Sequence, residues 1–307
     1  MKILLLFILF SQLAFSRGKC DMDLSLSNFS MDQNSFQSTT PINISMQRSK
    51  SPNDYHCYYY FYDFGKGNAN SYQRYLENSK GDKISYNLYK VNDFQNILTE
   101  LQDMNQNSDA IWGWVIGTGQ TYQNSFNVVL SYNSSLTYPA GTYTDSIPIK
   151  LYSGLPKNDP VREDNSNLFL TFTIRSSIAL SLVDVGSPFT DGDTVQTMNF
   201  GEIEDGDVME ADLKVRSNAG YRIYMKSFNK GKLKHQTLND KINYDLTING
   251  SSVNLKKGGK GDKVADASGV TPEAGENFRI KVILGAPGTA QAGTYTDYVT
   301  ITAETKD

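Results

Sequence analysis

The sequence predicts an all-β chain that folds as two copies of one β-sandwich domain. Three observations carry this prediction: apolar residues alternate with small or polar ones, turn-forming clusters separate these runs, and two motifs recur in the same order. The alternation is clearest at Phe126, Val128, Leu130 and Tyr132, at Ile147, Ile149 and Leu151, and at Val282 and Leu284. Turn clusters lie at residues 65–68, 133–135, 191–193 and 249–250.

The recurring motifs indicate an internal repeat. Residues 140–145, AGTYTD, return letter for letter at 292–297, and residues 83–88, KISYNL, are echoed at 241–246 by KINYDL. Two matches in order and at nearly the same offset predict two domains of one fold. We expect their boundary in the polar, proline-containing stretch 155–167.

The N-terminus has the features of a secretion signal over residues 1–16. Lys2 precedes an apolar run at 3–10, and Ala14-Phe15-Ser16 resembles a cleavage site. The run is shorter than the roughly 20 residues that a membrane span needs, so we expect an exported chain without a span; the alternative is a buried N-terminal helix. The net charge of −4 argues against nucleic-acid or anionic-membrane partners.

The mature chain has two cysteines, Cys20 and Cys57, and an even number in an exported protein favours one disulfide. Two free thiols or a metal pair are the alternatives. With two histidines and no recognisable catalytic or phosphate-binding motif, the sequence predicts no catalytic residue, no cofactor and no resident metal. Acidic clusters at 191–193 and 202–207 offer calcium ligands, but they lack EF-hand spacing and are typical of turns.

One segment has helical spacing. Between residues 91 and 104, and with Asn92 or Asp93 as the cap, the apolar residues lie three or four apart. They are Val91, Phe94, Ile97, Leu98, Leu101 and Met104. This face either packs on the sandwich or stays exposed and binds a surface, so Phe94, Ile97, Leu98, Leu101 and Met104 are candidate binding residues.

Aromatic residues concentrate in the first half of the chain. Fourteen of the 19 tyrosines precede residue 155, as do both tryptophans, and such side chains are favoured on recognition surfaces. Because neighbours on a strand face opposite sides, about half of the row 55–62 should lie outside the core, unless it packs locally. Tyr58, Tyr60 and Tyr62 are therefore further surface-binding candidates.

The order of motifs in the first domain resembles the spore coat protein U domain family, which is shared with subunits of archaic chaperone–usher pili. The resemblance rests on Cys20, Cys57, "YNLY" at 86–89, "WG…GTG" from Trp112 to residue 119, and "PAGTYTD" at 139–145. In the second domain "RSNAGYRI" at 216–223 and the second AGTYTD resemble a divergent copy. Two features depart from the family: the long segment 90–110 and the lack of cysteines in the second domain. Trp112, as part of the motif, is expected to be structural.

The resemblance implies immunoglobulin-like sandwiches that lack a strand, which a partner subunit supplies by donor-strand complementation. The alternating run 168–182 is too long for one strand, so we expect a break at 175–177. Its first half then closes domain one and its second half opens domain two, which has no closing strand. The predicted domains are 17–166, closed by about 167–175, and 176–307. The expected lining of the open groove is Tyr295, Tyr298, Val299 and Ile301.

These expectations together predict the adhesin at the tip of a chaperone–usher pilus. Only residues 17–19 precede Cys20 after cleavage, too few to donate a strand, so we expect a subunit that accepts one. The expected partners are a periplasmic chaperone, an usher and the next pilin subunit, with export through the periplasm to the cell surface. We expect the adhesive face on domain one, at the 90–110 insertion. The alternatives are a non-adhesive coat or matrix protein and a secreted carbohydrate-binding module.

Overall fold

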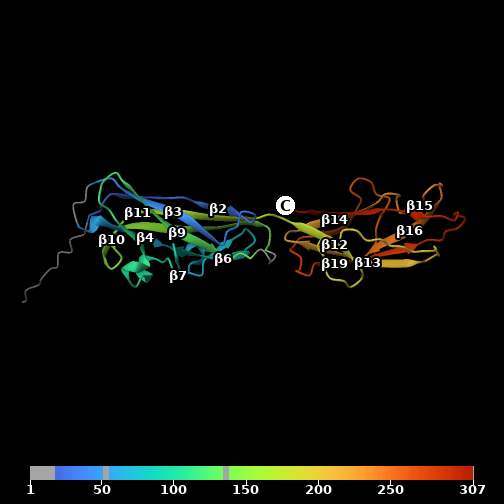
Figure 1. Ribbon diagram of the computed structural model, residues 1–307, viewed down its shortest axis with the longest axis horizontal. Helices are drawn as coiled ribbons and strands as arrows, with labels where there is room; N and C mark the ends of the chain where they lie inside the picture. Colours follow the sequence, from blue (N-terminus) through green and yellow to red (C-terminus); the bar gives the residue numbers. More distant parts are fainter. Residues whose placement is uncertain (1–17, 51–54, 134–137, 307) are drawn as a thin grey trace, which may run out of the picture. The chain divides into compact units, whose positions relative to one another are not determined.

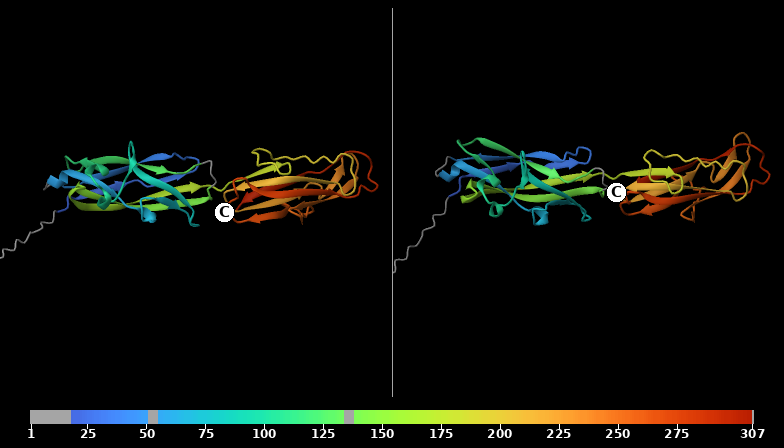
Figure 2. Two further views of the ribbon diagram at one scale, coloured as in Figure 1. Left: turned by 90° about the horizontal axis from the view of Figure 1, so that it is seen from below. Right: turned by 60° about the horizontal axis from the view of Figure 1, so that its bottom comes forward.

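The computed structural model describes residues 18–50, 55–133 and 138–306, and it divides the chain into two compact units. Unit 1 comprises residues 1–132 and 143–172, and unit 2 comprises residues 133–142 and 173–307. Within each unit the strands run nearly along one direction (Figures 1 and 2). The predicted signal peptide lies outside the described residues. Within those residues, no helix has the length and apolarity needed to cross a membrane.

Unit 1 is built from two layers of strands. The first contains β1 (Met22–Leu26), β3 (Thr39–Arg48), β9 (Thr121–Leu130), β6 (Lys83–Lys90) and β7 (Asp93–Ile97), in that order. The second contains β8 (Ile111–Trp114), β4 (Tyr59–Phe64), β10 (Gly141–Leu155), β11 (Asn158–Ile174) and β2 (Phe29–Asp32). The short β5 (Tyr75–Glu77) pairs with β6 and β10 and joins the layers. Short 3-10 turns are η1 (Tyr55–Tyr58), η2 (Gly67–Ala69), η3 (Leu101–Asp103) and η4 (Asn107–Asp109).

Unit 2 repeats this plan with fewer strands. One sheet has the order β12 (Ile178–Val183), β13 (Val208–Ser217), β19 (Glu276–Leu284), β16 (Lys241–Ile248), β15 (Lys232–His235) and β20 (Tyr295–Thr296), with β17 (Ser251–Ser252) on β16. The other has the order β18 (Asp262–Ala267), β14 (Tyr221–Ser227) and β21 (Val299–Thr305). The predicted all-β, two-domain architecture is confirmed.

The repeated motifs form the same Tyr–Asp pair in both units, buried in unit 1 and partly buried in unit 2. In unit 1 the hydroxyl of Tyr86 on β6 donates to Asp145 Oδ2 at 2.5 Å, and in unit 2 that of Tyr244 on β16 donates to Asp297 Oδ2 at 2.7 Å. Burial, reinforced by the neighbouring carboxylate, raises the pKa of both tyrosines, so each remains a donor at neutral pH. The sequence repeat is therefore a structural device that ties the strand carrying "Y-N/D-L" to the strand entered through AGTYTD.

The two units differ at the strand that covers the edge of the second layer. In unit 1, β11 lies between β10 and β2, and its inward side chains are fully buried: Leu168, Leu170, Phe172 and Ile174. The corresponding edge of unit 2 is β21, which pairs with β14 alone among the described strands. The break predicted at 175–177 is confirmed, because β11 ends at Ile174 and β12 begins at Ile178. Unit 1 thus has a closing strand that unit 2 lacks.

The boundary predicted at 155–167 is wrong. These residues belong to the hairpin between β10 and β11, and the division into units falls at residues 172 and 173. The stretch is polar because most of its side chains from Asn158 to Asn167 are exposed or only half-buried, although they lie within a strand. Polar composition here marks the exposed end of a long hairpin rather than a linker.

The helix predicted at 91–104 is also wrong. Asn92 has a φ of 65°, in the left-handed region, and turns the chain back so that β7 pairs with β6. The remainder forms the η3 turn. Residues 93–97 form part of their backbone hydrogen bonds with β6. A helix at this position would leave the backbone groups along this edge of β6 without those partners.

Candidate functional site

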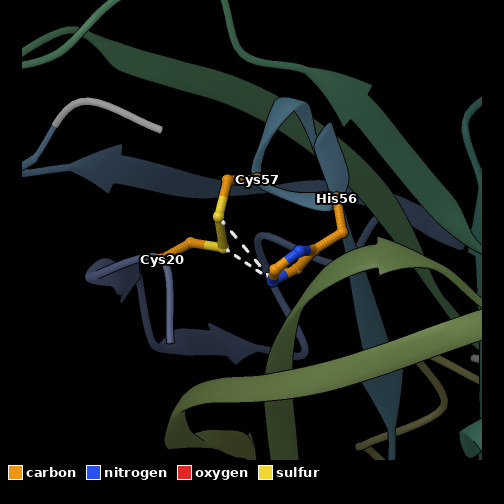
Figure 3. Close-up of side chains that lie close together, drawn as sticks. All are labelled: Cys20, His56 and Cys57. Carbon is orange, nitrogen blue, oxygen red and sulfur yellow. Dashed lines mark hydrogen bonds between the residues drawn. A yellow bond between two sulfur atoms is a disulfide. The ribbon is translucent and has the colours of Figure 1, made fainter. Parts of the chain in front are cut away.

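The disulfide predicted between Cys20 and Cys57 is confirmed, and it anchors one corner of unit 1. Figure 3 shows both sulfur atoms beside the His56 ring, whose Nε2 lies 3.3 Å from Cys20 Sγ. The Cys20 N–H donates to the Glu163 carboxylate, which also accepts a hydrogen bond from the Ser153 hydroxyl at 2.6 Å. The start of unit 1 is thereby fixed covalently to η1 and by hydrogen bonds to β11.

The same corner is the one group of three potential metal ligands among the described residues. The two sulfur atoms and a nitrogen of His56 lie within 4.8 Å of one another. Both sulfurs are consumed by the disulfide, and a metal binds the thiolate form of cysteine. The oxidised corner therefore acts as a structural anchor.

Half of the predicted surface-binding residues are buried, so they cannot contact a surface. These are Leu98, Met104, Tyr60 and Tyr62, each with at most 2% of its surface exposed. Ile97, Leu101 and Tyr58 are half-buried, and Phe94 is exposed.

The insertion explains this burial on the outer side of β4. Met104 and Ala110 pack on Phe61, and Leu101 and Tyr152 complete the cluster. β4 is consequently buried on both faces, since its other face, with Tyr60 and Tyr62, belongs to the core. Leu98 and Met104 of the insertion are therefore buried, as the packing alternative predicted, whereas Phe94 remains exposed.

An aromatic patch that the sequence analysis did not single out lies at the end of β4 and β8. We call it the aromatic platform and define it as Tyr55, Tyr59, Trp112 and Trp114. Its ring centroids are 5.7 Å apart for Tyr55 and Tyr59, 6.4 Å for Tyr59 and Trp112, and 5.2 Å for Tyr59 and Trp114. Trp112, which was expected to be structural, has 46% of its surface exposed.

The glycine of the "WG" motif explains why these rings face outward. Gly113 lies opposite Tyr60 in the β4–β8 pair, on the core side. A Cβ at Gly113 would lie 2.5 Å from Cζ of Tyr60, so no other residue fits there without displacing that ring. Tyr60 is fixed in turn by its hydrogen bond to Asn124 Oδ1 at 2.7 Å. The pattern Trp-Gly-Trp, with glycine inward, was the signal that two tryptophans share the outer face.

Unit 2 carries an apolar groove beside the uncovered edge of β21. It has a volume of about 180 Å³ and its lining comes from several strands and from the connection 184–207. The apolar lining residues are Leu182, Met198, Phe200, Ala211, Met225, Leu233, Leu246, Ile280, Val282, Val299 and Ile301. Of the predicted groove residues, Val299 and Ile301 line this groove, whereas Tyr295 and Tyr298 lie along the neighbouring hollow under 195–203.

The connection from β12 to β13, yellow in Figure 2, forms one wall of the groove. Met198, Phe200 and Ile203 pack against the core of unit 2, while Val195 is 79% exposed. Among the described residues, those from 194 to 203 make no backbone–backbone hydrogen bond. This wall is thus held by side chains alone, beside a strand whose outer edge is also unpaired.

Comparison with known proteins gives one match to a family model. The family model described as Spore Coat Protein U domain matches residues 13–150. No protein of curated function matches the chain.

Three solved structures are among those that the chain resembles at low identity. The CsuC-CsuE chaperone–tip adhesion subunit complex of Acinetobacter baumannii has 13% identity, a TM-score of 0.39, and coverage of 92% of this chain and 100% of that one. The CupB6 tip adhesin of Pseudomonas aeruginosa has 10% identity, a TM-score of 0.41 and coverage of 93% and 96%. CfaE, the adhesive subunit of CFA/I fimbria of enterotoxigenic Escherichia coli, has 12% identity, a TM-score of 0.40 and coverage of 92% and 94%.

Proposed function

Residues 13–150 match the family model described as Spore Coat Protein U domain, and from this match we propose that the chain is a two-domain adhesin at the tip of a chaperone–usher pilus. Unit 1 binds a surface, and unit 2 joins the pilus by accepting a strand from the next subunit. The chain has no catalytic role. It is exported through the periplasm and displayed at the cell surface.

One observation carries the proposal: the closing strand present in unit 1 is missing from unit 2. β21 presents an uncovered edge of backbone donors and acceptors beside an apolar groove, and its Val299 and Ile301 are only half-buried. Such an edge is a template for an added strand, whose backbone pairs with the edge while alternate side chains fill the groove. Unit 1 cannot accept a strand there, because β11 already covers β10.

The groove also identifies the partners. A chain with an open groove is prone to pair with other edges, so it needs a protein that covers the groove until assembly. A periplasmic pilus chaperone, the usher and the next pilin subunit fit this requirement. The chaperone complex of the Acinetobacter tip subunit and the fimbrial tip adhesins named above are consistent with this assignment.

Amide hydrogen exchange on the purified full-length chain tests strand acceptance. The probe is a synthetic peptide with the sequence of residues 166–175, the strand that closes the same fold in unit 1. We expect it to protect the amides of residues 299–305 and to leave those of β10 unchanged. A matched peptide carrying Leu170→Ser and Phe172→Ser should give no protection, since the two central side chains of the four that enter the core are then polar. If neither the peptide nor a pilus chaperone protects 299–305, the proposal is wrong.

Attachment assays separate the adhesin from a non-adhesive coat or matrix protein. A deletion strain should keep its pili but lose attachment if this chain is the tip adhesin. If the deletion strain attaches normally and has normal pili, the chain is a non-adhesive structural protein.

A further inference from the structure

We propose that the aromatic platform of unit 1 binds the apolar faces of uncharged sugar rings in a surface polysaccharide. The inference names the ligand class of the adhesive unit, and it rests on the proposed function for its biological setting. The binding site itself belongs to unit 1 and does not require the groove of unit 2.

Three of the four rings are exposed, and the fourth, Tyr59, is half-buried between them. Tyr59 and Trp114 are directly paired across β4 and β8, and Trp112 is paired with Phe61, so all of them point to the outer face. The two tryptophans are two residues apart, about 6.6 Å along the strand. The exposed fractions are 69% for Tyr55, 46% for Trp112 and 54% for Trp114. An exposed row of this length offers more than one sugar ring a flat partner.

The platform adjoins rigidly packed residues. Phe61, paired with Trp112 and fully buried, is stacked on Tyr152 with 5.0 Å between ring centroids and 8° between planes. The buried Arg48 donates from Nη1 to the carbonyl of Cys57 at 2.8 Å and from Nη2 to that of Gly117 at 3.1 Å. These bonds connect the segments that carry the rings on either side. Binding therefore costs little ordering of the rings, as in other preorganised recognition surfaces.

Polar groups border the rings where sugar hydroxyls would lie. The Val115 N–H donates to the Tyr58 carbonyl at 2.8 Å. Because hydrogen-bonded residues alternate along an antiparallel pair, Ile111 and Gly113 are the residues of β8 whose backbone groups face β4. The backbone groups of Trp112 and Trp114 are consequently directed to the opposite edge, where no other described strand pairs with β8. The hydroxyls of Tyr55 and Tyr59 lie 3.2 Å apart at the other side of the patch. A pyranose ring has the matching chemistry, an apolar C–H face and a rim of hydroxyls.

Charge and strand length argue against other ligands. Residues 55–62 and 110–122 contain no Asp, Glu, Lys or Arg, so an acidic polymer would find no counter-charge in the platform. β8 has only four residues, two of which direct backbone groups outward, so it offers little pairing to an extended peptide. Binding to a purely apolar surface would remove the outward backbone groups of β8 from water without replacing their hydrogen bonds. An uncharged glycan can stack on the rings and form hydrogen bonds with the polar groups at their border.

Intrinsic fluorescence gives a direct test, because Trp112 and Trp114 are the only tryptophans in the chain. The purified full-length protein is titrated with neutral oligosaccharides of the cello-, chito-, malto- and manno- series. We expect at least one series to shift the emission to shorter wavelength in a saturable manner and to protect it from acrylamide quenching. The same sugar should compete with retention of the protein on the corresponding insoluble polysaccharide.

Variants assign the effect to the platform. Removal of a stacking partner by Trp114→Ala should weaken binding at least about tenfold, whereas Trp114→Phe should retain most of it. Phe94→Ala is the matched control, because this aromatic residue is also exposed on unit 1 but lies outside the platform. Circular dichroism and melting temperature verify that each variant is folded.

The inference is overturned if no neutral series changes the emission, if Trp114→Ala binds like the parent protein, or if binding occurs only to acidic polysaccharides or to polystyrene without competition by sugars. These failures are distinct from failure of strand acceptance. The tryptophans report on unit 1, and the amides of 299–305 report on unit 2.

Discussion

Replacement of Phe172 by alanine tests whether β11 closes unit 1 as part of its own core. Phe172 is fully buried, and its ring lies 5.1 Å from that of Tyr132 and 6.0 Å from that of Phe36. Burial of such a side chain contributes about 1.5–3 kcal/mol, and the cavity left by truncation adds to the loss, so Phe172→Ala should lower the free energy of unfolding by about 4 kcal/mol. With a urea dependence of about 2 kcal/mol per molar, the unfolding midpoint should fall by about 2 M.

Tryptophan fluorescence during urea unfolding of the full chain measures this midpoint, because both tryptophans belong to unit 1. Phe169→Ala is the control: Phe169 lies on the same strand, is 51% exposed, and should change the free energy of unfolding by no more than about 0.5 kcal/mol. If the Phe172→Ala midpoint falls no further than that of Phe169→Ala, β11 does not carry the core of unit 1. The strand would then be replaceable by one from outside.

Three further outcomes follow from the buried groups. Tyr244→Phe should lower the free energy of unfolding of unit 2 by about 2 kcal/mol, since the carboxylate of Asp297 loses a charge-assisted bond; calorimetry should show this while the tryptophan transition stays in place. Reduction of Cys20–Cys57, 37 residues apart, should cost unit 1 about 4 kcal/mol, and an unchanged tryptophan transition would contradict the anchoring role. Burial raises the pKa of Tyr60 to about 12, above the ordinary value of about 10. The stability that the protonated Tyr60 contributes is therefore complete below pH 10 and is lost as the pH rises through 12. In an ultraviolet titration, Tyr60→Phe should lack the ionisation step that the parent protein shows near pH 12.

Period-two patterns predicted the parts of the fold in which one face of a strand is buried. The run from 168 to 182 shows this well, because its side chains from 168 to 174 alternate between the core and the surface and its full length required the break that lies between β11 and β12. The repeated motifs were equally informative. Their tyrosines and aspartates form one hydrogen-bonded pair in each unit, which no substitution to an apolar residue would preserve.

Patterns failed where a segment packs against something far away in sequence. Leu98 and Met104 have helical spacing, yet Leu98 directly follows β7, whereas Met104 follows the η3 turn and packs on Phe61. Likewise, strand alternation predicts that half of the tyrosine row is exposed, but β4 is covered on both faces. Only the three-dimensional fold shows that the insertion covers one end of β4 and leaves the other end, with the aromatic platform, uncovered.

The missing strand of unit 2 explains two irregular features together. In unit 1, β2 pairs with β11 only, and β11 separates β2 from β10. In unit 2 the segment 194–203 follows the first strand as β2 does in unit 1, and it lines the groove opposite β21. Without a counterpart of β11, neither the segment nor the outer edge of β21 has a backbone partner among the described residues. A single incoming strand between them would supply hydrogen bonds on both of its sides, so the segment 194–203 should become ordered as a strand in the same step that protects β21.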